Sequence, residues 1–130
     1  LSPSTPVWSA KALAIASEWR YYVLYGEVVG FARYAPIGTG QFVNPHIADI
    51  AAIIAAIPHD AAYAIDVAVL EHGECTVIAL RDAWALQLLA GGANAPEPLD
   101  YLKLLWARWS QLVVEARDQA AANSLPQSAR

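Results

Sequence analysis

Two neighbouring apolar segments constrain the fold of this chain most strongly: Ala61–Leu70 (AAYAIDVAVL) and Glu74–Leu86 (ECTVIALRDAWAL). Both contain many β-branched residues, and the short, glycine-containing sequence Glu71–Glu74 joins them. This pattern predicts a β-hairpin. Asp66 lies in the middle of the first strand, where an ionised carboxylate is costly unless it has a partner or a ligand. The contacts of Asp66 therefore decide which functions the chain can have.

Strand register identifies a candidate partner for Asp66. If Leu70 pairs with Cys75 across the loop, Asp66 lies opposite Ala79, and Arg81 is one diagonal step away on the same face. Alanines flank Asp66 on that face, so the surface is shallow. Two interpretations stay open: Arg81 neutralises Asp66 in a structural ion pair, or the shallow surface admits a ligand.

Composition limits the class of protein. The chain has 130 residues, of which 57% are apolar and 15% charged, as in a globular domain. We expect residues 1–118 to form one domain and residues 119–130 to form a tail. No uninterrupted apolar run reaches the roughly 18 residues of a membrane span. The net charge of −4 argues against a nucleic-acid surface.

The cysteine content and the N-terminal sequence indicate a compartment. Cys75 is the single cysteine, which excludes an internal disulfide, and we interpret it as a small core residue and not as a nucleophile. The start of the chain lacks a signal-peptide pattern. These features predict a cytoplasmic protein. The absence of methionine indicates a processed or excised part of a longer chain.

Outside the central hairpin, the sequence predicts a second pair of strands. Tyr21–Leu24 and Val28–Tyr34 are strand-like, and a tight turn at Tyr25-Gly26 or Gly26-Glu27 joins them. Strands arranged in hairpins with helices between them indicate an α+β fold, with an antiparallel β-sheet and two main helices packed on it.

Two helices are predicted. The first begins at Asn44-Pro45 and ends at Pro58, and the second is capped by Asp100. Apolar residues at helical spacing predict their core faces. These residues are Ile47, Ile50, Ile54 and Ile57 in the first helix, and Leu102, Leu105, Trp106, Trp109, Val113 and Ala116 in the second.

An arginine pair is the second candidate site. Strand parity places Glu18 and Arg20 on one face, with Arg33 on the same face of the neighbouring strand. Two adjacent arginines repel unless Glu18 bridges them or an anion such as phosphate binds, for which planar guanidinium groups are well suited. A solvated face with a Glu–Arg pair is the alternative interpretation.

Other residue types offer little chemistry. The three histidines, His46, His59 and His72, have no spacing that predicts a metal site. Trp84 lies just past the second strand of the central hairpin, where it either walls a pocket near Asp66 or packs in the core.

Four blocks of sequence resemble the C-terminal half of an ATP-grasp domain: SEWRYYVLYGEVVG, AAYAIDVAVLEHG, ALRDAWAL and YLKLLWARW. Their order and spacing are most similar to the compact bacterial clade named for one arginine and two lysines. The resemblance covers roughly residues 7–115. It implies ATP-dependent ligation, in which a carboxylate is phosphorylated, an amine or similar nucleophile displaces the phosphate, and magnesium bridges the phosphates of ATP.

The resemblance also implies roles for individual residues. Arg20 matches the arginine that contacts phosphate, and Asp66 matches the first metal-binding carboxylate. Ala79 and Arg81 occupy the two positions of a metal-binding Glu-x-Asn pattern, while Asp82 and Trp84 match the residues that follow it. With Arg33 as a further phosphate contact, these residues make up the expected ATP and magnesium site.

The sequence departs from the family pattern at the magnesium ligands. Alanine cannot ligate a metal and arginine repels one, so Asp66 alone is a poor site for a hard cation. We therefore expect a fragment or a degenerate ATP-grasp ligase, inactive as this chain alone. A non-catalytic binding or scaffold module is the alternative. The expected partner is the missing N-terminal half, another protein covering the sheet, or a second copy of the chain.

Overall fold

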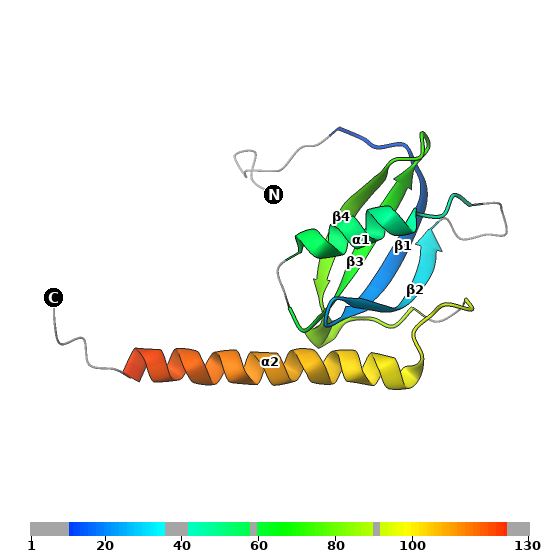
Figure 1. Cartoon of the computed structure of the whole chain (residues 1–130). Coiled ribbons are helices and arrows are strands. Elements are labelled where there is room, and N and C mark those ends of the chain that lie inside the picture. Colours follow the sequence, from blue (N-terminus) through cyan, green and yellow to red (C-terminus); the bar gives the residue numbers. More distant parts are fainter. Residues whose placement is uncertain (1–10, 36–41, 58–59, 90–91, 125–130) are drawn as a thin grey trace, which may run out of the picture.

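The computed structural model describes residues 11–35, 42–57, 60–89 and 92–124. Four strands form one antiparallel sheet in the order β2-β1-β3-β4 (Figure 1). The elements in chain order are β1 (Ile15–Leu24), β2 (Glu27–Ala35), α1 (Ile47–Ala56), β3 (Ala62–Leu70), β4 (Cys75–Asp82), a short 3-10 helix η1 (Ala83–Ala85) and α2 (Pro98–Ser124). The predicted α+β class with an antiparallel sheet is confirmed.

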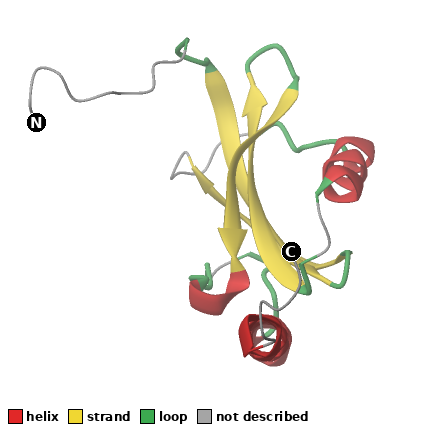
Figure 2. Ribbon diagram, turned by 90° about the vertical axis from the view of Figure 1, so that its left-hand side faces the viewer, coloured by secondary structure: helices red, strands yellow, loops and turns green. Residues whose placement is uncertain are grey.

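The two helices occupy different positions around the sheet. α1 lies against one face, whereas α2 crosses the end of the sheet near the β1–β2 turn and then continues past it (Figures 1 and 2). α2 extends to Ser124, beyond the domain boundary expected at residue 118. Neither helix, in the part of the chain that the structure describes, is long and apolar enough to cross a membrane.

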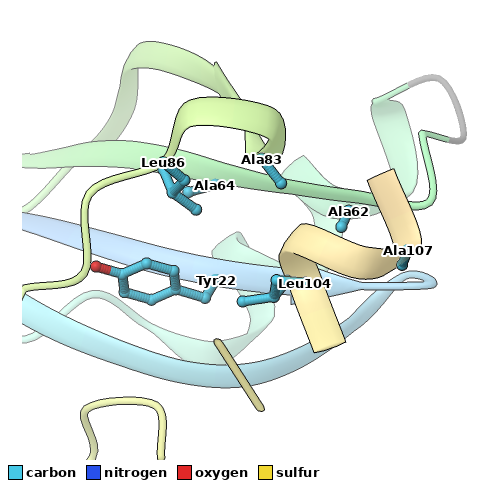
Figure 3. Close-up of a cluster of buried hydrophobic side chains, with 7 residues drawn as sticks. All are labelled: Tyr22, Ala62, Ala64, Ala83, Leu86, Leu104 and Ala107. Carbon is cyan, nitrogen blue, oxygen red and sulfur yellow. The ribbon is translucent and has the colours of Figure 1, made fainter. Parts of the chain in front are cut away.

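The core consists of two clusters separated by the sheet. One cluster packs under α1 and is made of Tyr21, Val23, Ile50, Tyr63, Ile65 and Val67. The other packs between the sheet, η1 and α2 and is made of Tyr22, Ala62, Ala64, Ala83, Leu86, Leu104 and Ala107 (Figure 3). Every residue of β3 is buried, because it is a central strand with neighbours on both sides. This burial explains the continuous apolar run around Asp66.

The β1–β2 turn uses the first of the two predicted positions. Leu24 pairs with Glu27, and the two residues between them, Tyr25 and Gly26, both have positive φ angles of 50° and 83°. Two consecutive residues with positive φ are characteristic of the type I′ turn, whose twist matches that of the flanking strands.

The strand register of the sheet is shifted at several places, and two of these shifts decide where Arg33 and Asp66 lie. Between the pairs Tyr22–Gly30 and Val23–Val28, β2 contains an extra residue, and the pairing beyond it shifts by one. Arg33 consequently lies opposite Trp19, on the other face from Arg20. The prediction that the two arginines share a face is wrong, because a bulge reverses parity.

The second bulge lies in β4. Val69, and not the predicted Leu70, pairs with Cys75, so the register at the loop is one residue away from the expectation. An extra residue between the partners of Val67 and Asp66 compensates for this shift. The predicted pairing of Asp66 with Ala79 is therefore confirmed.

Both helices begin at positions other than those predicted. α1 begins at Ile47, two residues after Pro45, and His46 precedes it without a capping side-chain hydrogen bond. α2 begins at Pro98, which places Asp100 in its first turn and not at its cap. In α1, Ile50 is buried, but Ile47 is 87% exposed. Pro58 lies outside the described residues.

The core face predicted for α2 is wrong. Leu104, Ala107 and Arg108 are the buried residues of this helix. The predicted residues Leu102, Trp106, Trp109, Val113 and Ala116 are exposed, and Leu105 is half-buried. The helix thus carries two different stripes, of which the more apolar one faces away from the sheet.

Candidate functional site

A cluster of three charged side chains, two of them buried, joins the three strands β1, β3 and β4. Asp66 lies opposite Arg20 on β1 and opposite Ala79 on β4. Arg20 donates to both carboxylate oxygens, from Nε to Oδ1 at 2.7 Å and from Nη2 to Oδ2 at 2.9 Å. Nε of Arg81 donates to Oδ2 at 2.5 Å. Because Ala79 is small, Arg81 can reach diagonally across to Asp66, as predicted.

Burial and charge together set the electrostatics of this cluster. The side chains of Asp66 and Arg20 are only 1% and 8% exposed, whereas that of Arg81 is 50% exposed. Burial alone would raise the pKa of Asp66, but the hydrogen bonds and charges of the two guanidinium groups outweigh it and hold this pKa below its usual range. The cluster carries one more positive than negative charge, and Arg81 brings that charge to the surface.

The remaining contacts of Arg20 hold its guanidinium in place. Its Nη1 donates to the backbone carbonyl of Gln87 at 3.4 Å, and its Cζ lies 5.7 Å from the centroid of the Tyr34 ring. The hydroxyl of Tyr22 donates to the same Gln87 carbonyl at 3.0 Å. Arg20 is therefore a fixed part of the sheet face, with its nitrogens directed at protein acceptors.

A shallow pocket of about 470 Å³ lies beside the charged cluster. It is lined by Arg20, Leu80, Arg81, Asp82, Trp84, Ala85, Leu86 and Gln87. Trp84 is 53% exposed and contributes to the wall, as one of its two sequence interpretations proposed. The pocket thus combines an exposed guanidinium with an aromatic wall.

The described residues do not fit a magnesium ion at Asp66. Magnesium takes oxygen ligands in near-octahedral geometry, usually a carboxylate or two with several waters. Both oxygens of Asp66 already accept N–H hydrogen bonds, the facing residue is Ala79, and the guanidinium of Arg81 occupies the remaining approach. Among the described residues, no group of three or more His, Cys, Asp or Glu side chains could hold a metal ion.

Arg33 lies apart from this cluster. It shares the opposite face of the sheet with Trp19, and its Cζ is 3.1 Å from the centroid of the Phe42 ring. One interpretation of the sequence was that Glu18 bridges Arg20 and Arg33. Because the two arginines lie on opposite faces of the sheet, this interpretation is wrong. Burial raises the pKa of Tyr34, and the nearby Asp66 and Glu18 raise it further. Because the Tyr34 ring lies beside Arg20, Glu18 is also one of the groups around Arg20.

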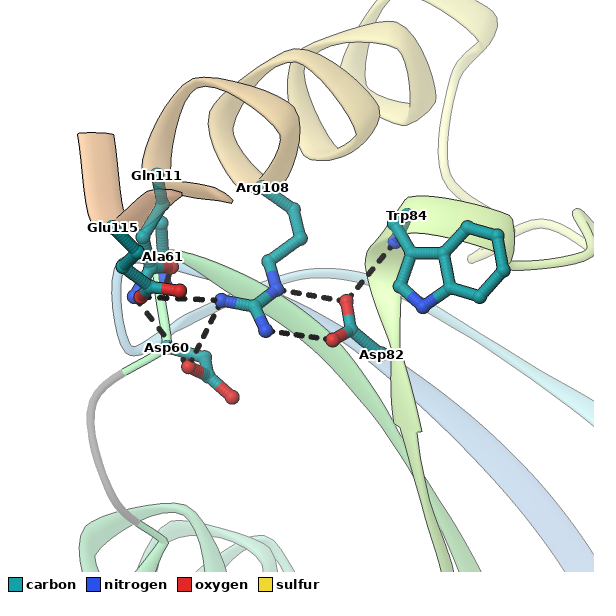
Figure 4. A network of polar contacts seen from close by, with 7 residues as sticks. All are labelled: Asp60, Ala61, Asp82, Trp84, Arg108, Gln111 and Glu115. Carbon is teal, nitrogen blue, oxygen red and sulfur yellow. Dashed lines mark hydrogen bonds and ion pairs between the residues drawn. The ribbon is translucent and has the colours of Figure 1, made fainter. Parts of the chain in front are cut away.

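A second polar network, which the sequence did not predict, fixes α2 to the sheet (Figure 4). Arg108 donates to both carboxylate oxygens of Asp82 at 2.8 and 2.7 Å, and to Asp60 at 3.1 Å. Asp82 also accepts from the backbone N–H of Trp84 at 3.1 Å. Gln111 accepts from the backbone N–H of Ala61 at 2.7 Å. Asp60, just before β3, and Asp82, at the end of β4, are the residues from which the sequence could have indicated this network.

Two further side chains have interpretable environments. Burial raises the pKa of the Cys75 thiol, and Cys75 packs against the cluster under α1. This environment agrees with the interpretation of Cys75 as a small core residue, since a reactive cysteine needs a lowered pKa. Asp82, through its contacts with Arg108, has a pKa held below its usual range.

A comparison with protein-family models matches residues 1–104 to an ATP-grasp domain family, the second family of the clade named for one arginine and two lysines. This region includes all four strands and the complete charged cluster of Arg20, Asp66 and Arg81. No curated protein and no solved structure matches the chain.

Proposed function

We propose a function from the premise that this chain belongs to the second ATP-grasp family of the clade named for one arginine and two lysines. The proposed function is that of a ligase-like domain that has lost the magnesium-dependent step. We assign its sheet to the C-terminal half of the ATP-grasp fold. In this proposal Arg81 stands where the family binds a cation, and the chain alone does not carry out ligation.

One observation carries the proposal: the carboxylate oxygens of Asp66 are shared between Arg20 and Arg81. We propose that Asp66 corresponds to the metal-binding carboxylate of the family. An arginine is permanently charged, so it neutralises the buried carboxylate at every accessible pH without needing a metal. The guanidinium thus replaces the charge of the cation. It cannot replace its coordination chemistry, because it presents only hydrogen-bond donors.

Of the four expected nucleotide contacts, Arg20, Asp82 and Trp84 line the pocket, whereas Arg33 is on the opposite face of the sheet. Arg20 and Asp82 are already paired with Asp66 and Arg108. A phosphate or a base entering the pocket would therefore meet the indole of Trp84 and the exposed guanidinium of Arg81, which was not among the expected contacts. We infer that this pocket does not bind ATP tightly, with or without magnesium.

Thermal melting of the chain tests this proposal. The melting temperature is measured with EDTA, with magnesium, with ATP, and with magnesium and ATP together. We expect no change, because a ligand stabilises a protein only when it binds the folded state. A rise of several degrees that requires both magnesium and ATP would show that the family site still functions, and would refute the proposal.

A second candidate function is a non-catalytic binding module. It is favoured by exposed apolar side chains on α2, including Trp106 and Trp109. A ligase would be distinguished from such a module by magnesium-dependent ATP turnover, which the module lacks even when its binding partner is present.

A further inference from the structure

The exposed apolar stripe of α2 has the spacing of a coiled-coil seam. Its residues alternate in steps of three and four along the helix; they are Leu99, Leu102, Trp106, Trp109, Val113 and Ala116. This repeat of about 3.5 residues is the one that lets two helices wrap around each other with a continuous apolar contact. A helix that only covers a sheet needs no such regular repeat.

The seam lies on a different side of α2 from the contacts with the sheet. Leu104 and Ala107 enter the core cluster, and Arg108 reaches the carboxylates at the sheet end (Figures 3 and 4). Trp106 and Trp109, by contrast, are 76% and 52% exposed. The two sets of residues interleave along the helix, so a second helix could pack on the seam without displacing the sheet.

From Val113 onward, α2 is not covered by any part of the chain that the structure describes. Figure 1 shows the helix continuing past the sheet, and every residue from Val113 to Ser124 is exposed. An isolated helix is marginally stable in water, and most helices in proteins are stabilised by packing of an apolar face. The length of α2 and the continuation of its seam into this part of the helix both indicate a partner helix.

We propose that the partner is α2 of a second copy of this chain, packed antiparallel to the first. If Trp106 packs in one layer with Trp109 of the other copy, Leu102 meets Val113 and Leu99 meets Ala116 in the successive layers. Each leucine then faces a smaller aliphatic residue, and the two tryptophan layers, which are the thickest, lie next to each other at the centre of the contact. A parallel pair would instead place two alanines in one layer and two leucines in another.

The size and flanks of the seam are suited to a self-complementary contact. A large aromatic side chain buries about 150–250 Å², so the exposed seam offers an apolar area of roughly 600 Å² per helix. Two copies would together bury about 1,200 Å², which is the lower end of the range for stable interfaces. Half-buried Leu105 and Leu112 flank it and extend the apolar surface. On the other flank, Lys103 is paired with Asp100 at 2.7 Å, which reduces repulsion between the two copies.

Sedimentation equilibrium of the full chain tests this proposal. We expect a monomer–dimer equilibrium, and we expect Trp106→Ala to raise the dissociation constant about a hundredfold, since an interface tryptophan is a typical hot spot and the symmetric dimer loses two. Trp84→Ala is the matched control: it removes a tryptophan outside the seam that is 53% exposed, against 76% for Trp106 and 52% for Trp109, and it should leave the constant unchanged. Circular dichroism verifies that each variant is folded, and Leu102→Lys provides an independent seam variant.

Disulfide trapping tests the orientation. In a Cys75→Ser background, chains with Leu102→Cys are mixed with chains with Val113→Cys and oxidised. The antiparallel arrangement predicts the mixed disulfide. A strict monomer, a dimer weakened equally by Trp84→Ala and Trp106→Ala, or disulfides only between identical positions would each overturn the proposal. These outcomes do not depend on magnesium or ATP, so they are independent of the proposed loss of catalysis.

Discussion

The two arginines that bind Asp66 should contribute unequally to stability. Asp66 and Arg20 are almost fully buried and share two hydrogen bonds, whereas Arg81 is half-exposed and contributes one. Replacing Arg20 with leucine leaves a buried carboxylate with a single partner at its edge, and breaking a buried pair in this way costs about 3–5 kcal/mol. Arg81→Leu should cost only about 1 kcal/mol, because solvent screens the exposed guanidinium.

Urea unfolding of the wild type and the two variants measures this difference. A loss of about 3–5 kcal/mol is a large part of the 5–15 kcal/mol typical of a domain, so Arg20→Leu should move the midpoint strongly at an unchanged m-value. The double change Arg20→Leu with Asp66→Leu should recover much of the loss, because a buried ion pair is often replaceable by apolar residues of similar size.

Equal losses for Arg20→Leu and Arg81→Leu would refute this reasoning. So would a double variant as unstable as the sum of its two single changes, since that result would mean that Arg20 stabilises the fold through contacts other than Asp66.

Three other perturbations probe Asp66, Arg108 and Gly30 in turn. Burial alone would raise the pKa of Asp66, but two guanidinium groups hold it below the ordinary 3.8. Its stabilising effect is therefore complete above about this pH and is lost as the pH falls through the folded-state pKa, which acid titration of the urea midpoint checks. Asp66→Asn should reduce this dependence and leave the part that comes from Asp82, whose pKa is also lowered. Arg108→Ala should cost about 2 kcal/mol and loosen α2 from the sheet end, visible as faster amide hydrogen exchange in the first turns of α2; unchanged exchange would contradict this role. Gly30→Ala would place a Cβ 2.5 Å from the backbone nitrogen of Pro96 and should destabilise by about 1–3 kcal/mol in thermal melts, whereas a neutral effect would mean that the chain segment around Pro96 can move away.

The sheet was largely predictable because its signals are local. The β-branched runs of the central hairpin and the glycine in each tight turn identify the strand pairs, and the structure confirms both hairpins. The pairing of Asp66 with Ala79 was predicted from a loop register that is wrong by one residue, and the bulge in β4 compensates for this error. The prediction was therefore correct only because of a bulge that the residue pattern does not reveal.

Bulges also explain the main error at the candidate site. One extra residue in β2 places Arg33 beside Trp19 and not beside Arg20. Gly30 directly follows the extra residue Val29, and a glycine inside a strand indicates either a bulge or a close approach of another backbone segment. The sequence does not decide between these two causes, and Gly30 also lies against Pro96. The sequence therefore predicted Arg81 correctly as a partner of Asp66 and Arg20 as part of the same site, but not the direct pairing of Arg20 with Asp66, and it added Arg33 from the opposite face.

The error in α2 has a different physical cause. The most apolar stripe of a helix normally faces the core, but here the sheet-facing stripe contains Arg108 and Gln111, whose polar groups are satisfied by Asp60, Asp82 and a backbone N–H. Polar residues can face the core side when such partners exist. Those partners lie far away in the sequence, so only the folded structure brings them together.

The central claim is that Arg81 has replaced the cation at Asp66, and a restored site tests it most directly. The double variant Ala79→Glu with Arg81→Asn returns the two missing oxygen ligands while Arg20 still holds Asp66. Melting temperatures of this variant and the wild type are compared as magnesium is titrated, with sodium at matched ionic strength as the control. We predict a magnesium-dependent rise in the variant and none in the wild type. A magnesium-dependent rise of equal size in the wild type would contradict the account.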